Sequence, residues 1–149
     1  MQIRLTTKVD GYYRDVMDRF DRDLFEALKP PLGQMNILAF TGSKKGDKVH
    51  IQFESPIKAE WISLITEDEV NEEEAYFIDE GELLPFPLAY WKHKHIVRKI
   101  DEHSSYIIDD ITFKGTNHLM SLMLYPAIYL GFAPRKKIYQ RYFSQLMER

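Results

Sequence analysis

The order of hydrophobic periods along the chain constrains the fold more than any other feature. Between residues 35 and 113, apolar side chains alternate with polar ones in several short runs, as in strands with one buried face. Near the C-terminus the period becomes helical, and the apolar side is formed by Ile138, Tyr139, Tyr142, Phe143 and Leu146. A sheet with an apolar face needs a cover, and this helix is the only long amphipathic element available. We therefore predict an α+β fold in which a curved antiparallel sheet of about six or seven strands wraps around a long C-terminal helix.

The remaining elements follow from the same patterns. Ile3, Leu5 and Thr7 alternate with polar residues, which predicts a first strand. Apolar residues then recur every four positions over 16–28, which predicts two short helices separated near Asp21. The later strands are predicted at residues 35–41, 48–54, 57–66, 75–79, 89–100 and 105–113.

Length and charge narrow the class of protein. A chain of 149 residues fits one domain, which we expect to span residues 1–149. The net charge of −3 argues against nucleic acid as a partner, and we expect the short basic run Arg135-Lys136-Lys137 to be a solvated helix start. The chain has no cysteine and its N-terminus lacks the pattern of a signal peptide, so we expect a cytoplasmic location.

One segment is apolar without a polar side. From Gly115 to Pro134 no residue carries a full charge, which is about the length of a membrane span. Asn117 and His118 are polar, and Pro126 interrupts the middle, so we do not predict a transmembrane segment. We expect this segment to be the lid of a cavity, with a homodimer through Leu119–Phe132 as the second interpretation.

Five short motifs occur in the order of a known family. They cover about residues 76–141, and they are Phe77-Ile78-Asp79-Glu80, Pro85-Phe86, Trp91-Lys92-His93-Lys94-His95, Asp110-Ile111-Thr112-Phe113 and Ile138-Tyr139-Gln140-Arg141. In these motifs the chain resembles the START-like superfamily of birch-pollen-allergen-like, polyketide-cyclase-like and lipid-transfer domains, and most of all its bacterial ligand-binding SRPBCC branch. It departs from the pattern at Leu84, where a glycine is common, and at Ile138, where an aromatic residue is usual.

The resemblance implies a helix-grip fold with an internal cavity between the sheet and the long helix. The function that it implies is binding or transport of a small hydrophobic molecule, lipid-like or aromatic. One alternative is an enzyme of the cyclase or dehydratase kind that uses the same cavity. Another is an interaction module that docks a partner through its apolar face. The sequence does not name the ligand, and we assign no catalytic residue and no cofactor.

Aromatic residues supply most of the expected cavity wall. The chain holds nine Phe, nine Tyr and two Trp, and ligand pockets are mostly apolar with a few placed polar groups. We expect the cavity to be lined by Phe25, Phe53, Trp61, Phe77, Trp91, His93, His95, Tyr125, Ile128, Tyr129 and Phe132.

The two histidines admit several roles. His93 and His95 lie two positions apart on a predicted strand, so both side chains share one face. They could be structural, polar contacts for a ligand, a general base or metal ligands. The position where a cupin would supply a third ligand holds Lys99 or Ile100, so we expect no metal. We interpret Asp79 and Asp110 as carboxylates at strand ends and the acidic stretch 67–74 as a solvated hairpin end.

Overall fold

The computed structural model describes residues 1–29, 34–55 and 57–147. Within these ranges the chain forms seven strands and four helices. In chain order they are β1 (Gln2–Asp10), α1 (Tyr13–Asp18), α2 (Arg22–Ala27), β2 (Gln34–Phe40), β3 (Lys48–Ser55), β4 (Ala59–Val70), β5 (Glu74–Leu83), β6 (Leu88–Lys99), β7 (Ser104–Gly115), α3 (His118–Phe132) and α4 (Arg135–Met147).

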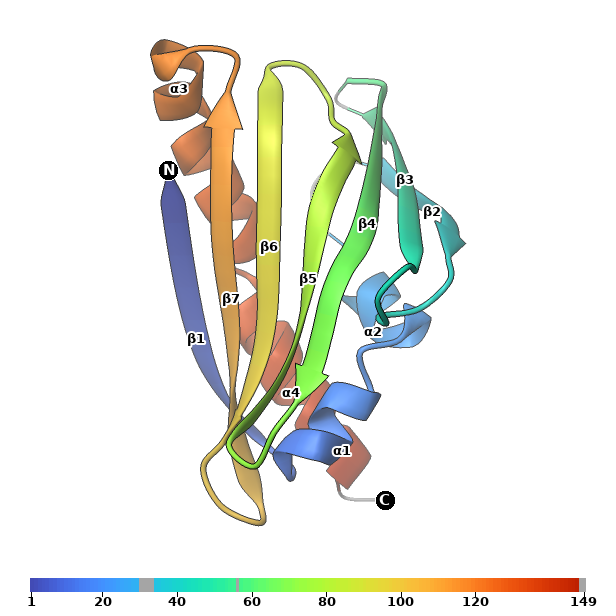
Figure 1. The fold of residues 1–149 in the computed structure, drawn as a ribbon, viewed down its shortest axis with the longest axis vertical. Helices are drawn as coiled ribbons and strands as arrows, with labels where there is room; N and C mark the ends of the chain where they lie inside the picture. The colour runs from blue at the N-terminus through green and yellow to red at the C-terminus, as the bar shows by residue number, and fades with distance from the viewer. Residues whose placement is uncertain (30–33, 56, 148–149) are drawn as a thin grey trace.

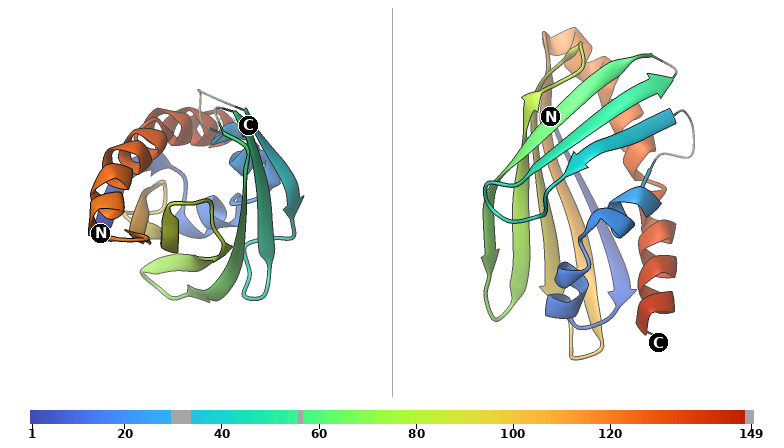
Figure 2. Two further views of the ribbon diagram at one scale, coloured as in Figure 1. Left: turned by 90° about the horizontal axis from the view of Figure 1, so that it is seen from above. Right: turned by 90° about the vertical axis from the view of Figure 1, so that its right-hand side faces the viewer.

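The strands form one antiparallel sheet in the order β1-β7-β6-β5-β4-β3-β2 (Figure 1). Seen from above, the sheet curls, and α3 and α4 run along its open side (Figure 2). The short helices α1 and α2 lie beside the lower part of the sheet. The predicted α+β fold, with two short helices after the first strand and a long helical cover, is confirmed.

The helical cover is bent rather than straight. It consists of α3 and α4, and the break falls at Ala133 and Pro134. A proline is compatible with the first turn of a helix but cannot donate a hydrogen bond to the preceding turn, so the second segment starts afresh after it. The bend lets α3 follow β7 while α4 packs against β1.

Close contacts fix where α3 begins. The Asn117 side chain accepts a hydrogen bond of 2.9 Å from the backbone N–H of Met120, which caps the helix. The backbone N–H of Gly115 donates to the hydroxyl of Ser121 over 2.8 Å. A Cβ atom at position 115 would lie 2.7 Å from the backbone nitrogen of Ser121, so only glycine permits this approach. The end of β7 therefore holds α3 against the sheet.

Two apolar clusters hold the helices on the sheet. In the first, Tyr139 and Phe143 of α4 are fully buried against α1 and the strands. In the second, Trp91 and Phe113 pack against Phe132 and its neighbours on α3. Buried aromatic side chains of this size contribute strongly to stability, so each cluster fixes one half of the cover. Polar side chains are buried close to both clusters, and they form the candidate site.

The acidic stretch 67–74 forms the solvated end of the β4–β5 hairpin, as predicted, but both strands extend further into it than expected. Strand β4 continues through Glu67 and Glu69 to Val70, and β5 begins at Glu74. The hydroxyl of Tyr76 on β5 lies 3.0 Å from Glu67 and 2.9 Å from Glu69, so these carboxylates accept hydrogen bonds across the strand pair. The turn between the two strands is short and consists of the polar residues 71–73. The acidic side chains of this strand are stabilised by contact with solvent and by the hydrogen bonds from Tyr76.

Candidate functional site

A cavity of about 230 Å³ lies between the curved sheet and α3. Strands β2, β3 and β4 supply one wall, β5 and β6 supply the floor, and α2, α3 and the first residue of α4 supply the remaining lining. Most of the lining is apolar. The lining residues are Phe25, Leu28, Met35, Val49, Ile51, Phe53, Trp61, Ser63, Asp79, Trp91, His93, His95, Ala127, Ile128, Gly131, Phe132 and Arg135.

The polar part of the lining comes from neighbouring strands. In the register of β5 and β6, Asp79 is opposite His93 and Phe77 is opposite His95. In the register of β6 and β7, His95 is opposite Asp109. Side chains directly opposite each other share a face of the sheet, so these groups all point inward. The folded sheet thus brings together two histidines and two aspartates that are distant in sequence.

The carboxylate of Asp79 lies close to the imidazole rings of His93 and His95 and to the indole of Trp91. Its Oδ2 atom lies 2.6 Å from Nε2 of His95 and 3.7 Å from Nδ1 of His93. Its Oδ1 atom accepts a hydrogen bond of 3.0 Å from the indole N–H of Trp91. The two imidazole rings stack with centroids 3.6 Å apart, and Phe77 stacks on the other face of His95 at 4.2 Å. These contacts fix the orientation of both rings.

Asp109 organises the second half of the network. Its Oδ1 atom lies 2.8 Å from Nε2 of His93, and the Tyr139 hydroxyl donates to the same oxygen over 3.3 Å. The Arg135 guanidinium is 3.6 Å from that oxygen, and it also lies over the ring of Phe132 at 4.1 Å from its centroid. The side chains of Asp109 and His93 are each only 3% exposed. The first residues of α4 are therefore tied to the sheet through buried charges.

Burial and charge shift several pKa values in this network. Burial alone would raise the pKa of Asp79, but its hydrogen bond from His95 and the nearby His93 lower it below the ordinary value. Burial likewise opposes ionisation of Asp109, yet His93 and Arg135 lower its pKa to about 2. Burial and the neighbouring His93 lower the pKa of His95 to about 4. Burial and the charge of Asp109 raise the pKa of Tyr139.

Neither a family model nor a curated protein matches the sequence. Solved structures do match the fold. A point mutant of norcoclaurine synthase from Thalictrum flavum has a TM-score of 0.73 at 12% identity, over 99% of this chain and 96% of that one. The Zhui aromatase/cyclase from Streptomyces has a TM-score of 0.68 at 10% identity, over 93% and 90% of the chains. A START superfamily protein from Mycobacterium smegmatis has a TM-score of 0.67 at 11% identity, over 97% and 98%.

The chain has a START-like helix-grip fold. At these identities the likeness concerns the fold, so the chemistry has to come from the residues of this chain. The fold implied by the five sequence motifs is thereby confirmed. Among the described residues, none of the helices combines the length and apolar composition that crossing a bilayer requires.

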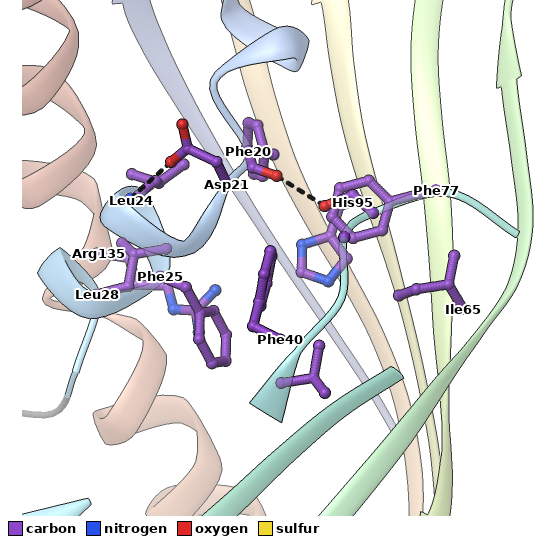
Figure 3. Close-up of a pocket in the computed structure, with 13 residues that line it drawn as sticks. Phe20, Asp21, Leu24, Phe25, Leu28, Phe40, Ile65, Phe77, His95 and Arg135 are labelled. Carbon is purple, nitrogen blue, oxygen red and sulfur yellow. Dashed lines mark hydrogen bonds between the residues drawn. The ribbon is translucent and has the colours of Figure 1, made fainter. Parts of the chain in front are cut away.

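Most residues that were predicted to line the cavity of the START-like fold do line it. These are Phe25, Phe53, Trp61, Trp91, His93, His95, Ile128 and Phe132. Phe77 lies beside the cavity instead, in the lining of a smaller pocket of about 40 Å³ (Figure 3). The two pockets share Phe25, Leu28, Val49, His95 and Arg135. Tyr125 and Tyr129 do not line the cavity. They are 39% and 42% exposed, and the ring of Tyr125 lies 6.3 Å from that of Phe113 on β7.

Two polar residues of the network were not predicted from the sequence. Asp110 was singled out, but its side chain is on the outer face of β7 and pairs with Arg4 over 3.2 Å. The buried carboxylate is its neighbour Asp109. Arg135 was expected to be solvated, yet its side chain is 13% exposed and faces Asp109. The signal for Asp109 was present, because it is in phase with the inward residues Ile107 and Ile111.

One buried ring atom of this network has no hydrogen-bond partner in the described part of the chain. Among the side chains that the structure describes, Nδ1 of His95 makes no hydrogen bond. Because Nε2 of His95 faces a carboxylate, the proton of the neutral ring belongs on Nε2, which leaves Nδ1 as an acceptor. Asp79, His93 and His95 are also the group that could hold a metal ion, since one donor atom of each lies within 4.8 Å of the others.

Proposed function

We propose that the protein binds one small, mostly apolar molecule in the cavity and directs a polar group of that molecule toward Asp79, His93 and Arg135. The observation that supports this most directly is the cavity of about 230 Å³ with an apolar wall and a buried polar end. Pockets for small molecules commonly combine these two features. The polar end fixes the orientation of the guest, and the apolar wall supplies most of the binding free energy.

The volume limits the size of the guest. An apolar cavity of about 150 Å³ is large enough for benzene. The present cavity is larger, at about 230 Å³, so a one-ring or two-ring compound fits better than a lipid with long chains. Trp61 and Trp91, which both line the cavity, are in edge-to-face contact with ring centroids 4.8 Å apart. They offer rigid aromatic surfaces for a planar guest. We therefore favour an aromatic ligand over a lipid-like one.

Enlarging one side chain of the wall provides a test. The Ile128→Trp variant is expected to weaken binding of 2-naphthol at least about tenfold, because the indole would occupy the space of the guest, a change of roughly 1.4 kcal/mol. Fluorescence titration of 2-naphthol measures the dissociation constant. The matched control is Leu122→Trp on the exposed side of the same helix, which is expected to bind as tightly as the unaltered protein. Absence of binding by the unaltered protein, or equal weakening by both variants, contradicts the proposal.

The same network favours a second candidate, an acid–base enzyme of the cyclase or dehydratase kind. In His93 a carboxylate orients the imidazole from one side while the residue also lines the cavity, which is the arrangement of a general base. Native mass spectrometry of the freshly purified protein separates a binding protein from an enzyme that removes water. A binding protein retains the same co-purified mass over time, whereas a dehydratase releases a molecule lighter by one water.

The outer face of α3 favours self-association as an additional property. Leu119, Leu122, Met123 and Leu130 are between 50% and 68% exposed on this helix. Exposed apolar patches of this kind commonly mark interaction sites. We propose a second copy of this chain as the occupant, because the face carries no charge that would select a charged partner.

Sedimentation equilibrium tests the self-association. The unaltered protein is expected to form a dimer that the Leu130→Glu variant loses, because a buried carboxylate without a partner is costly. The matched control is Val70→Glu, which adds the same charge at an exposed position at the end of β4. A strict monomer for the unaltered protein, or dimers in all three proteins, contradicts the assignment of this face.

A further inference from the structure

Three donor side chains converge on one point at the floor of the cavity. Asp79 projects from β5, and His93 and His95 project from β6. One donor atom of each residue lies within 4.8 Å of the others, and all three residues line the cavity. We infer that Asp79, His93 and His95 bind one divalent transition-metal cation of the zinc or ferrous iron type, with the remaining coordination positions directed into the cavity.

The distances suit such an ion after a small adjustment. Metal–nitrogen and metal–oxygen bonds of about 2.0–2.2 Å place two tetrahedral ligands roughly 3.4 Å apart. Nδ1 of His93 is 3.7 Å from Oδ2 of Asp79, close to this value. Nε2 of His95 is 2.6 Å from the same oxygen, the distance of a hydrogen bond. Replacing that shared proton by an ion requires this pair to separate by roughly 1 Å.

Neighbouring groups already hold the ligands as a metal site requires. Metal-binding histidines usually donate their other ring N–H to a carboxylate, and ligating carboxylates are themselves hydrogen-bonded. Here Nε2 of His93 is 2.8 Å from Asp109, which leaves Nδ1 to face Asp79. The indole N–H of Trp91 holds the second oxygen of Asp79 at 3.0 Å. Two of the three ligands are therefore oriented by partners from outside the triad.

The charges of the site also favour the binding of a cation. Two carboxylates, Asp79 and Asp109, are buried together, and Arg135 lies 3.6 Å from the second of them. One negative charge is therefore left for a proton or a metal ion to compensate. Two imidazoles with one carboxylate suit zinc, iron or cobalt, whereas calcium and magnesium prefer oxygen ligands throughout. The chain has no cysteine, so thiolate ligation does not compete.

In the sequence pattern alone, His93 and His95 have no third ligand on their own strand. A cupin would supply its third ligand four or five positions after His95, where this chain has Lys99 and Ile100, and for that reason no metal was expected. The structure supplies the third donor from across the sheet, because Asp79 is the register partner of His93. An ion at this place would contact the polar group of a guest in the cavity. The inference does not depend on such a guest, since the test uses the metal ion alone.

Zinc titration of the full-length protein, first stripped with a chelator, tests the inference by calorimetry. We expect one equivalent of Zn²⁺ to bind, and we expect His95→Gln and Asp79→Asn each to weaken binding at least about tenfold. Trp91→Phe, which removes the donor to Asp79 but keeps an aromatic ring in the cluster, is expected to weaken zinc binding by roughly tenfold. The matched control is His103→Gln, an exposed histidine in the turn between β6 and β7, which is expected to bind zinc unchanged.

A second measurement keeps the test decisive if a variant fails to fold. In the unaltered protein, Co²⁺ is expected to shift the imidazole NMR resonances of His93 and His95 far more than those of His50, His103 and His118. No zinc binding by the unaltered protein overturns the inference. Equal binding by His95→Gln and Asp79→Asn, or a cobalt effect centred on the other histidines, also overturns it. A failure of 2-naphthol to bind would leave all of these outcomes unaffected.

Discussion

Replacing Asp109 by alanine is expected to lower the free energy of unfolding by about 3–5 kcal/mol, because the change leaves a buried guanidinium without its carboxylate. Asp109 contacts His93 at 2.8 Å, Tyr139 at 3.3 Å and Arg135 at 3.6 Å. Its removal therefore leaves the guanidinium without a counter-ion and the proton of the Tyr139 hydroxyl without its acceptor. Urea unfolding followed by circular dichroism measures the loss.

The adjacent residue provides the control for this prediction. Asp110 is on the same strand, but it points outward and pairs with Arg4, whose side chain is 46% exposed. Asp110→Ala is expected to cost less than about 1 kcal/mol, because exposed ion pairs contribute little. If the alanine variant of Asp109 does not fold, Asp109→Asn, which keeps the shape, is expected to show a smaller loss in the same direction. Equal losses at positions 109 and 110 would contradict the assigned role of the network.

The sheet could be predicted because its signal is local. In strand β3 the inward residues Val49, Ile51 and Phe53 alternate with outward ones, and all three line the cavity. Such alternation shows directly which side chains share a face. The need for a cover then determined the place of the final helix. These steps use only neighbouring residues and the requirement that apolar surface be buried.

The orientation of α3 could not be predicted in this way. A helix reveals its inward face through the contrast between apolar and polar positions. In α3 nearly every residue is apolar, so the sequence gives no such contrast, and Tyr125 and Tyr129 were placed inward with Ile128 and Phe132. In the structure neither tyrosine lines the cavity, and the two side chains are 39% and 42% exposed. Only the contacts of α3 with β7 and β6 decide this rotation.

The polar network was only half predictable for a different reason. His93 and His95 stand out in the sequence, but their partners come from other elements. Asp79 is 14 positions before His93 and becomes its neighbour only through the register of β5 and β6. Arg135 begins a basic run that is typical of a solvated helix start, and its burial depends on the bend at Pro134. Contacts of this kind are set by the assembled fold.

Acid is expected to destabilise the protein through His95. Between about pH 6.5 and pH 4, we expect the free energy of unfolding to fall by roughly 3 kcal/mol, at about 1.4 kcal/mol per pH unit. The pKa of His95 is about 4 in the folded state and near 6.5 in the unfolded state. Within this window the unfolded chain binds a proton that the folded chain does not, so stability rises with pH and is lost toward acid. Urea unfolding at several pH values measures the slope.

The surroundings of His95 explain why its ring stays neutral in the folded state, and a substitution at this position provides the control. The ring is buried against Phe77 and the second imidazole of His93, while Asp79, Asp109 and the more distant Arg135 complete the charges around it. Burial outweighs the attraction of the two carboxylates. In the His95→Gln variant, the free energy of unfolding is expected to change little between pH 6.5 and 4. The variant is expected to keep the further loss of stability below pH 4. There Asp109, whose pKa in the folded state is about 2, takes up a proton only in the unfolded chain. If the unaltered protein is equally stable at pH 6.5 and pH 4, then His95 is already protonated in the folded state. The assignment of a neutral His95 ring with Nδ1 as a free acceptor would then be wrong.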